Sequence, residues 1–158
     1  MDRGMLKNKK GFSLLEVMTT VMILGISVGL FYTTFYYNWL TMDTYATRSN
    51  LMQEMDQILD FVTDKVRQAQ SVSIPITDPK TVNLTPSSLG SFSYTANGLF
   101  TFQPAGGTAQ NLSYSVDPSN TIFTKGASGD LTVQLTLKQP TSGKNAILSS
   151  TVQVYPRN

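Results

Sequence analysis

The first long run of apolar positions begins at Phe12 and continues to about Leu40, directly after a basic segment. Within it, Val17–Met42 contains no charged side chain. A helix rises about 1.5 Å per residue, so about 20 apolar residues cross a hydrocarbon core of about 30 Å. We therefore predict a transmembrane helix over residues 12–40. A single carboxylate, Glu16, interrupts the apolar run near its start.

From about residue 41 the apolar residues recur every three or four positions instead of continuously. They are Leu51, Met55, Ile58, Leu59, Val62 and Val66. This spacing predicts an amphipathic helix over residues 41–70 with one buried stripe. No proline occurs before Pro75, and Ser71–Pro79 is typical of a helix exit. We therefore expect one continuous helix from about Ser13 to about Ala69.

After Pro79 the apolar period changes from that of a helix to the two-residue period of a strand. Between Leu131 and Leu137 every second residue is Leu or Val, and Thr or Gln stands between them. Asn97-Gly98 lies between two β-rich runs and predicts a hairpin. The expected strands are Ser91–Thr95, Leu99–Gln103, Leu112–Val116, Thr121–Thr124, Leu131–Lys138 and Ile147–Tyr155.

The connections between these strands are too short to carry crossover helices, so the sheet is expected to be antiparallel. Both the sheet and the helix stripe need an apolar partner, and packing one on the other satisfies both. The predicted fold class is α+β. One long N-terminal helix, membrane-spanning and then amphipathic, packs on a C-terminal antiparallel β-sheet domain of residues 71–158.

Two further features belong to the apolar run. Aromatic residues gather at its distal end, as in the belt that Tyr and Trp form at a membrane–water boundary: Phe31, Tyr32, Phe35, Tyr36, Tyr37 and Trp39. Gly25 and Gly29 are spaced four apart, which permits close approach of a second helix. Glycines are also common in membrane helices in general, so both interpretations stand.

The positive charge of the chain is concentrated before the apolar run. The formal net charge is +2, yet residues 1–11 hold four basic side chains and one acidic side chain. Residues 12–158 hold eight basic and nine acidic side chains. The basic bias predicts that the leader, residues 1–11, stays in the cytoplasm. The remainder carries no basic footprint of the kind that nucleic-acid binding requires.

The chain is poor in residues that carry catalysis. It has no histidine and no cysteine, which removes His-activated nucleophiles, thiol chemistry and disulfides. No phosphate-binding or dinucleotide-binding glycine motif is present. We predict that the protein is not an enzyme and uses no cofactor. Four oxygen donors could suit calcium, but they match no EF-hand spacing and Asx turns explain them better, so no metal site is predicted: Asp117, Ser119, Asn120 and Asp130.

Residues Lys9–Val17, KKGFSLLEV, resemble the class III signal of type IV pilins and type II secretion pseudopilins. A basic leader ends in Gly11, and Phe12, a small polar residue, two aliphatic residues and Glu16 follow. The resemblance implies a pilin-like fold, cleavage between Gly11 and Phe12 by a prepilin peptidase, and N-methylation of Phe12. An ordinary secretory signal would instead place its cleavage site after the apolar region.

The same resemblance implies that Glu16 pairs with the new amino group of Phe12 on a neighbouring subunit. A carboxylate in a membrane-length helix is costly, and pairing in an apolar environment offsets much of the lost hydration. The alternative is that Glu16 lies shallowly among lipid headgroups, where its charge costs little.

Two further stretches resemble particular members of that family. Met55–Ala69 resembles the helix end of J-type minor pseudopilins and W-type minor pilins, with an acid-x-x-Arg-Gln-Ala ending at Asp64–Ala69. Ser149–Asn158 is similar to the last strand and Arg-Asn end of such proteins. The resemblance implies a minor pilin or pseudopilin, a structural subunit near the tip of a type IV pilus or type II secretion filament that helps to initiate assembly.

The partners implied are other pilin or pseudopilin subunits, the prepilin peptidase, an inner-membrane assembly platform and, before assembly, membrane lipid. The protein would cross the bacterial inner membrane once, with its leader cytoplasmic and its C-terminal domain extracytoplasmic, and then enter the filament. The alternative function is a signal-anchored extracytoplasmic binding domain that takes no part in a filament.

Overall fold

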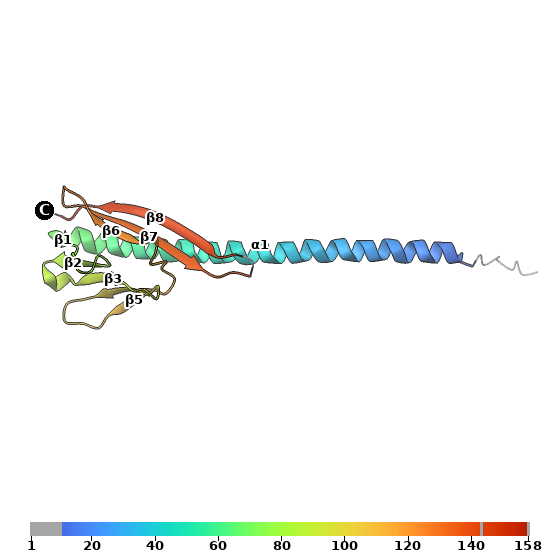
Figure 1. Ribbon diagram of the computed structural model, residues 1–158, viewed down its shortest axis with the longest axis horizontal. Coiled ribbons are helices and arrows are strands. Elements are labelled where there is room, and N and C mark those ends of the chain that lie inside the picture. The colour runs from blue at the N-terminus through green and yellow to red at the C-terminus, as the bar shows by residue number, and fades with distance from the viewer. Residues whose placement is uncertain (1–10, 143, 158) are drawn as a thin grey trace, which may run out of the picture. The chain divides into compact units, whose positions relative to one another are not determined.

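The structure is a computed structural model that describes residues 11–142 and 144–157. A single helix, α1, covers Leu14–Gln68 and confirms the predicted continuous helix (Figure 1). Its N-terminus is capped by Ser13, whose Oγ accepts the N–H of Leu15 (3.3 Å) and whose carbonyl accepts the N–H of Val17 (3.1 Å). A serine that precedes an apolar helix satisfies N–H groups that the helix itself leaves unpaired.

The described chain divides into two compact units between Thr41 and Met42. In the first unit, α1 leaves its large apolar side chains exposed, from 49% at Val17 to 81% at Leu14, except for the partly buried Leu40. Its Ser and Thr hydroxyls donate to carbonyls three or four residues back, as Ser27 does to Ile23 (2.8 Å) and Thr34 to Leu30 (2.9 Å). Hydroxyls bonded in this way need no water, which suits a helix in an apolar environment.

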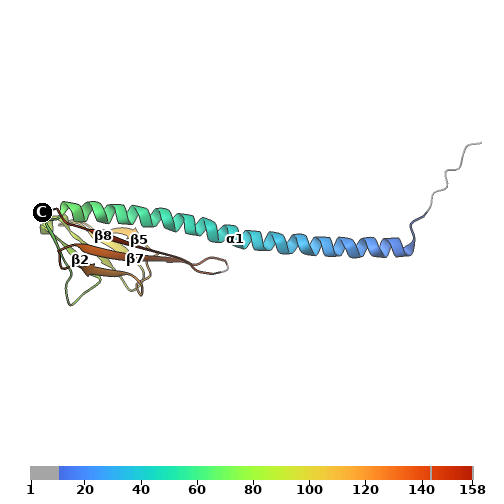
Figure 2. The same cartoon turned by 90° about the horizontal axis from the view of Figure 1, so that it is seen from above.

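The second unit contains the strands beside the remaining part of α1 (Figure 2). The strands are β1 (Ser71–Ser73), β2 (Thr81–Thr85), β3 (Ser91–Tyr94), β4 (Phe100–Gln103), β5 (Gln110–Ser113), β6 (Ile122–Lys125), β7 (Leu131–Gln139) and β8 (Ala146–Val154), and a 3₁₀ turn, η1, covers Ser87–Leu89. Every paired neighbour is antiparallel, as predicted. The strands form two sheets, ordered β1-β2-β3-β4-β5 and β6-β7-β8, and not one.

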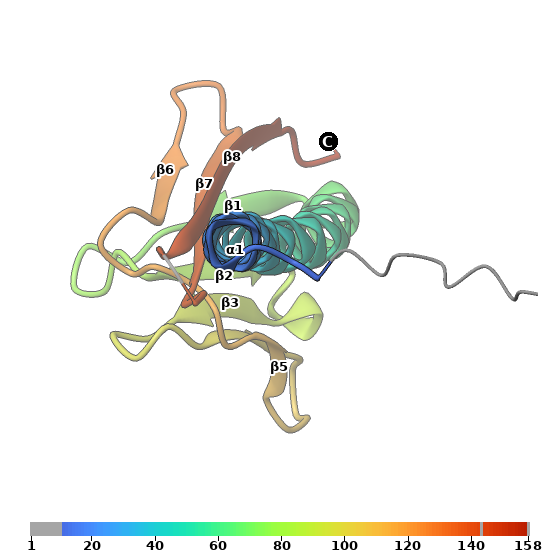
Figure 3. The same cartoon turned by 90° about the vertical axis from the view of Figure 1, so that its right-hand side faces the viewer.

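The two sheets are separate layers in Figure 3 and are joined through aromatic side chains. The hydroxyl of Tyr94 on β3 donates to the carbonyl of Thr121 (2.7 Å), which directly precedes β6. The ring of Phe123 on β6 lies 5.3 Å from that of Tyr94 and 6.1 Å from that of Phe100 on β4, measured between centroids. Buried aromatic pairs of this kind add stability beyond the area that they bury.

The predicted helix stripe is buried in this core, except for Leu59, which is only partly buried. Leu51, Met55, Ile58, Val62 and Val66 are at most 3% exposed. Opposite them lie the inward residues of β7, namely Leu131, Val133, Leu135 and Leu137, each fully buried. Phe61 of α1 packs against the other sheet. The centroid of its ring lies 6.2 Å from that of Phe92 and 5.2 Å from that of Phe102.

The observed strands differ locally from the predicted ones. β1 was not predicted because its three residues cannot display an alternating pattern. β2 was not predicted either, although its buried residues Val82 and Leu84 do alternate with more exposed ones. The strand expected over Leu112–Val116 is β5, displaced toward Gln110. Ser113 Oγ accepts the N–H of Ser115 (2.9 Å), so the backbone leaves the first sheet there, and Val116 makes only an isolated bridge to Leu137 of the second.

Candidate assembly site at the start of the helix

The predicted cleavage point lies outside the helix. Gly11 and Phe12 precede the first residue of α1, both are exposed, and Phe12 keeps 79% of its surface accessible. A Cβ built on Gly11 would meet no atom within 4 Å. The peptide between these two residues is therefore exposed and free of the helical hydrogen bonds that would hold it away from an enzyme.

Glu16 lies in the first turn of α1, where the helix dipole favours a negative charge. Its backbone carbonyl accepts the hydroxyls of Thr19 (3.0 Å) and Thr20. Within residues 11–142 and 144–157, its carboxylate has neither a hydrogen bond nor an ion pair. The carboxylate is exposed beside apolar side chains, so it is available to a partner outside the chain.

Ser13 and Glu16 also fit a local pattern that sequence analysis did not use. A serine cap followed three residues later by glutamate is the signature of a capping box, in which the glutamate reaches back to the N–H of the cap. The Oγ of Ser13 caps the helix, but it accepts the N–H of Leu15 and not that of Glu16. Glu16 makes no such return bond in the described chain, so local capping does not occupy its carboxylate.

The four oxygen donors considered for calcium do not converge. Asp117 accepts the N–H of Ser119 (3.1 Å) and the amide of Asn120 (3.0 Å), which forms an Asx turn. These two hydrogen bonds lower the pKa of Asp117, that from Asn120 most strongly. Asp130 is buried elsewhere and accepts the amide of Gln153 (2.7 Å). Among described residues no cluster of three metal-ligating carboxylates occurs.

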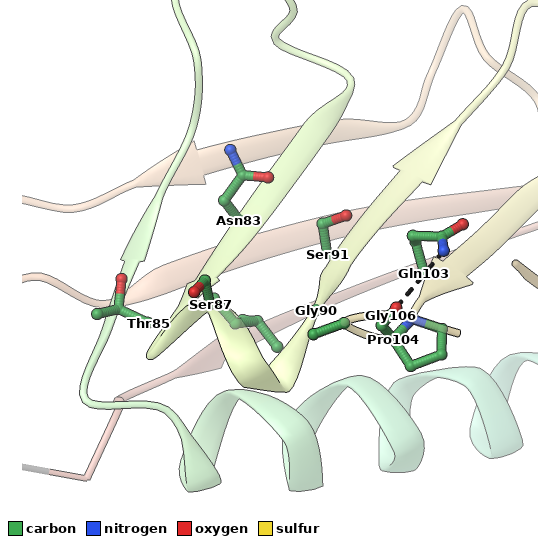
Figure 4. Close-up of a pocket in the computed structure, with 10 residues that line it drawn as sticks. Asn83, Thr85, Ser87, Gly90, Ser91, Gln103, Pro104 and Gly106 are labelled. Atoms are coloured by element: carbon green, nitrogen blue, oxygen red, sulfur yellow. Dashed lines mark hydrogen bonds between the residues drawn. The ribbon is translucent and has the colours of Figure 1, made fainter. Parts of the chain in front are cut away.

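The sheet domain also carries a shallow hollow of about 600 Å³ that sequence analysis missed (Figure 4). Asn83, Ser91 and Gln103 are direct neighbours across β2, β3 and β4 and present their side chains on the face away from the core. Gly90 and Gly106 form part of its wall. Its lining has no charged side chain, so it offers hydrogen bonds to a neutral group but no acid–base pair for catalysis.

Comparison with known proteins identifies one feature of the chain. Residues 6–32 match the prokaryotic N-terminal methylation motif, a stretch that contains Gly11, Phe12 and Glu16. No curated protein and no solved structure matches the chain. The motif supports a protein of the type IV pilin or pseudopilin type, a family that is structural and not enzymatic.

The motif and the helix agree with each other. In the described chain α1 is the one helix long and apolar enough to cross a membrane, judged by length and composition. A methylation motif at the start of such a helix fits a single-pass membrane-anchored protein and a substrate of prepilin peptidase that assembles with other pilin subunits. The fold, one long N-terminal helix on antiparallel strands, is pilin-like.

Proposed function

We propose that the chain is a minor pilin or minor pseudopilin, a structural subunit of a type IV pilus or type II secretion filament. The observation that carries the proposal is the methylation motif at the start of a helix whose first part buries no large apolar side chain. Such a surface requires lipid before assembly and neighbouring helices afterwards. Placement near the tip, with a role in starting assembly, is part of this proposal and draws on the resemblance of Asp64–Ala69 to J- and W-type minor subunits.

The proposed mechanism begins with cleavage between Gly11 and Phe12 by prepilin peptidase on the cytoplasmic side. The new amino group of Phe12 is methylated and keeps its positive charge. On extraction from the membrane, Glu16 of one subunit meets that amino group on another. Both groups lose hydration in the filament interior, so pairing in the correct axial register is favoured and unpaired registers are penalised. The assembly platform and neighbouring subunits are the partners in this step.

The experiment compares two glutamates on the same helix. Glu16→Gln removes the charge of the assembly site, and Glu54→Gln removes the only other glutamate of the chain. Loss of one partner from a buried ion pair costs about 3–5 kcal/mol, so Glu16→Gln should lower incorporation into sheared filaments by roughly 100-fold or more. Glu54→Gln should enter filaments normally, and both variants should keep the fold of the sheet domain.

The second test is mass spectrometry of the protein from its native host, which measures cleavage and methylation. The proposed subunit lacks residues 1–11 and carries one added methyl group on Phe12. A chain that retains its leader would favour the second candidate, a tethered extracytoplasmic binding domain. The observation on the side of that candidate is the neutral hollow beside Asn83, Ser91 and Gln103, which has a volume suited to a small ligand. Normal assembly of Glu16→Gln would contradict the proposed pairing.

A further inference from the structure

The marginal strands of the two sheets differ in length and in protection. Three of them, β1, β5 and β6, have only three or four residues. The fourth, β8, pairs with β7 over nine residues without a register shift. It contains no charged residue and no proline between Ala146 and Val154. Short strands, charges, prolines and bulges keep a sheet edge from pairing further, and β8 has none of these devices.

Contacts on the opposite side of β7 show which backbone groups of β8 face outward. The carbonyl of Thr136 accepts the N–H of Asp117 (2.8 Å), and the N–H of Lys138 donates to the carbonyl of Ser115 (2.6 Å). Even-numbered residues of β7 therefore direct their backbone groups away from β8. Odd-numbered residues direct theirs toward it, because the direction alternates along a strand. The register pairs these odd-numbered residues with the even-numbered residues of β8.

The odd-numbered residues of β8 thus direct both backbone groups to the open edge of the sheet. We call them the outward set, and they are Ile147, Ser149, Thr151 and Gln153, all exposed. Among residues 11–142 and 144–157, none of their backbone N–H or C=O groups has a hydrogen-bond partner. Donors and acceptors that alternate along an extended edge match the backbone of another strand.

The side chains of β8 add an apolar surface on the core side. Leu148 and Val152 pack against the core but remain only partly buried. Side chains directly opposite each other on paired strands lie on the same face of a sheet. A strand added at this edge therefore extends the cover of the core if every second residue is apolar. Backbone bonds supply the affinity of such strand addition, and the alternate side chains supply its specificity.

Charges on either side of β8 define the ends of the partner segment. Lys144 precedes the strand and Arg157 follows it. In the described chain neither side chain makes a hydrogen bond or an ion pair. The strand between them is uncharged. A partner segment with an uncharged centre and an acidic residue at each end complements this pattern.

A second copy paired through its own β8 does not fit a shared membrane. Before β8, the N–H of Ser142 donates to Asp43 (2.9 Å), and after it, the N–H of Arg157 donates to the carbonyl of Ala69 (3.1 Å). β8 therefore runs in the same direction as α1, as Figure 1 shows. Antiparallel pairing, the more stable kind, would point the helices of two copies in opposite directions. Two chains anchored in one membrane with the same orientation cannot adopt that arrangement.

We propose that the open edge of β8 binds an extended segment of a different protein, which adds an antiparallel strand to the second sheet. The segment is uncharged over most of the length of β8, apolar at every second position, and acidic at both ends. The contact gives the sheet domain a role in partner binding beyond that of a structural subunit. It does not rest on the filament proposed above, since the edge belongs to the second unit alone.

A synthetic peptide tests the edge directly. It carries the sequence of Leu131–Leu137, LTVQLTL, between two glutamates, and is added to the full chain in detergent. Amide hydrogen exchange is followed by NMR at each residue of β8. On saturation with peptide, exchange of the outward set should slow by roughly tenfold or more. The amides of Leu148, Ser150 and Val152 are already bonded to β7 and should change little.

Two N-methylated peptides provide matched controls. When the Leu and Val side chains face the core, the N–H groups of Thr and Gln point at β8, and those of Leu and Val point to water. Methylation of the Thr and Gln nitrogens should lower the affinity by roughly tenfold or more, because it removes the bonds to β8. Methylation of the same number of Leu and Val nitrogens should leave the affinity within about twofold.

A pair of variants at one position tests the protein side of the contact. Thr151→Pro loses an outward N–H, and proline is tolerated at such positions on an edge strand. The peptide should bind this variant roughly tenfold more weakly. Thr151→Ala keeps both backbone groups and should bind like the wild type. Protection of the Ser150 and Val152 amides confirms that β8 stays folded, and the N-methylated peptides decide the question if it does not.

The charge pattern has a separate test. A peptide with lysines in place of both glutamates should bind about threefold more weakly at low salt, and the difference should shrink at high salt. Equal affinity at low salt would contradict the acidic ends of the proposed partner.

Three results would overturn strand addition by a different protein. Equal binding of the two N-methylated peptides would show that backbone bonds do not carry the contact. Slower exchange without alternation along β8 would place the peptide on a face of the sheet. If the outward set is protected without peptide and the chain sediments as a dimer, a second copy occupies the edge. None of these results bears on leader cleavage or on Glu16, so the proposed function is tested separately.

Discussion

Leu24 and Val62 belong to the same helix, yet their surroundings are opposite. The side chain of Leu24 is 64% exposed, whereas that of Val62 is 1% exposed. The difference extends to whole segments, since the described residues of the first unit bury no large apolar side chain and the second unit encloses its apolar stripe beneath two sheets. Helicity alone therefore does not distinguish them.

The comparison shows where each segment finds its stabilisation. Around Val62 the apolar surface is removed from water within the chain, which stabilises this unit in isolation. Around Leu24 the same kind of surface is stable only when lipid or another protein covers it. The second unit is thus stabilised by its own core, whereas the first unit needs lipid or another protein to cover it. A membrane-anchored subunit that assembles with others requires both.

The largest expected effect comes from a cavity in the second unit, which is stabilised by its own core. Phe100 on β4 is fully buried and contacts Phe92 and Phe123. Phe100→Ala should lower the free energy of unfolding by about 3–5 kcal/mol, because it loses apolar burial and leaves a void. Chemical denaturation of the full chain in detergent, followed by amide hydrogen exchange of β4 and β7, measures the loss.

The matched control is Leu24→Ala, which deletes a similar amount of apolar side chain from the first unit. It should leave the exchange of β4 and β7 unchanged, because no core residue loses a neighbour. Equal destabilisation by the two substitutions would show that the first unit contributes to the stability of the second, and that the division described above is wrong.

A smaller effect is expected from Gly90→Ala, and Gly25→Ala serves as its control. Gly90 has a φ of +98°, and a Cβ there would lie 2.2 Å from the carbonyl oxygen of Gln103. Gly90→Ala should cost about 2–3 kcal/mol, because a side chain meets both a strained backbone conformation and a fixed backbone atom. The midpoint of denaturation, compared with that of the wild type, measures the cost.

Gly25 supplies the contrast on the exposed part of the helix. A Cβ at Gly25 meets nothing within 4 Å, and alanine is the better helix former. Gly25→Ala should therefore leave the sheet domain unaffected. Its effect should be confined to incorporation into filaments, where a second helix approaches closely. A drop in domain stability equal to that of Gly90→Ala would contradict this account.

The elements that sequence analysis predicted are those with a long, regular pattern. The stripe from Leu51 to Val66 repeats over four turns, and β7 alternates over the seven residues from Leu131 to Leu137, so both were identified from periodicity. β1 is three residues long and carries no measurable period. The division into two sheets was not predicted either, because alternation defines which face of a strand is buried but not which strand is its neighbour.

Candidate sites were likewise predicted where their residues are adjacent in sequence and missed where the fold brings distant residues together. Gly11, Phe12 and Glu16 form a contiguous motif, so their association required no knowledge of the fold. Arg67 and Arg157 belong to two stretches that sequence analysis named only for their resemblance to family members, and they line one hollow because the N–H of Arg157 donates to the carbonyl of Ala69. A contact across that length of chain leaves no periodic or local signal in the sequence.

The smallest expected effect concerns Asp43, which lies just beyond the boundary between the two units. Its carboxylate accepts the backbone N–H of Ser142 (2.9 Å) in the β7–β8 connection, and this bond lowers its pKa below the ordinary value of 3.8. A lowered pKa means that the folded state holds this proton less readily than the unfolded state. The stabilisation is therefore complete above pH 3.8 and is lost as the pH falls through the lower, folded-state value.

Asp43→Asn should therefore change little at neutral pH, where the amide oxygen can still accept the N–H of Ser142. It should flatten the acid limb of a plot of unfolding free energy against pH. Asp117, whose pKa is also lowered by hydrogen bonds, should maintain part of the slope, and Asp43→Asn/Asp117→Asn should reduce the slope further. If Asp43→Asn and the wild type give parallel curves below pH 3.8, Ser142 does not hold this carboxylate in solution. The part of α1 that the core of the second unit stabilises would then begin further along, nearer the fully buried Leu51.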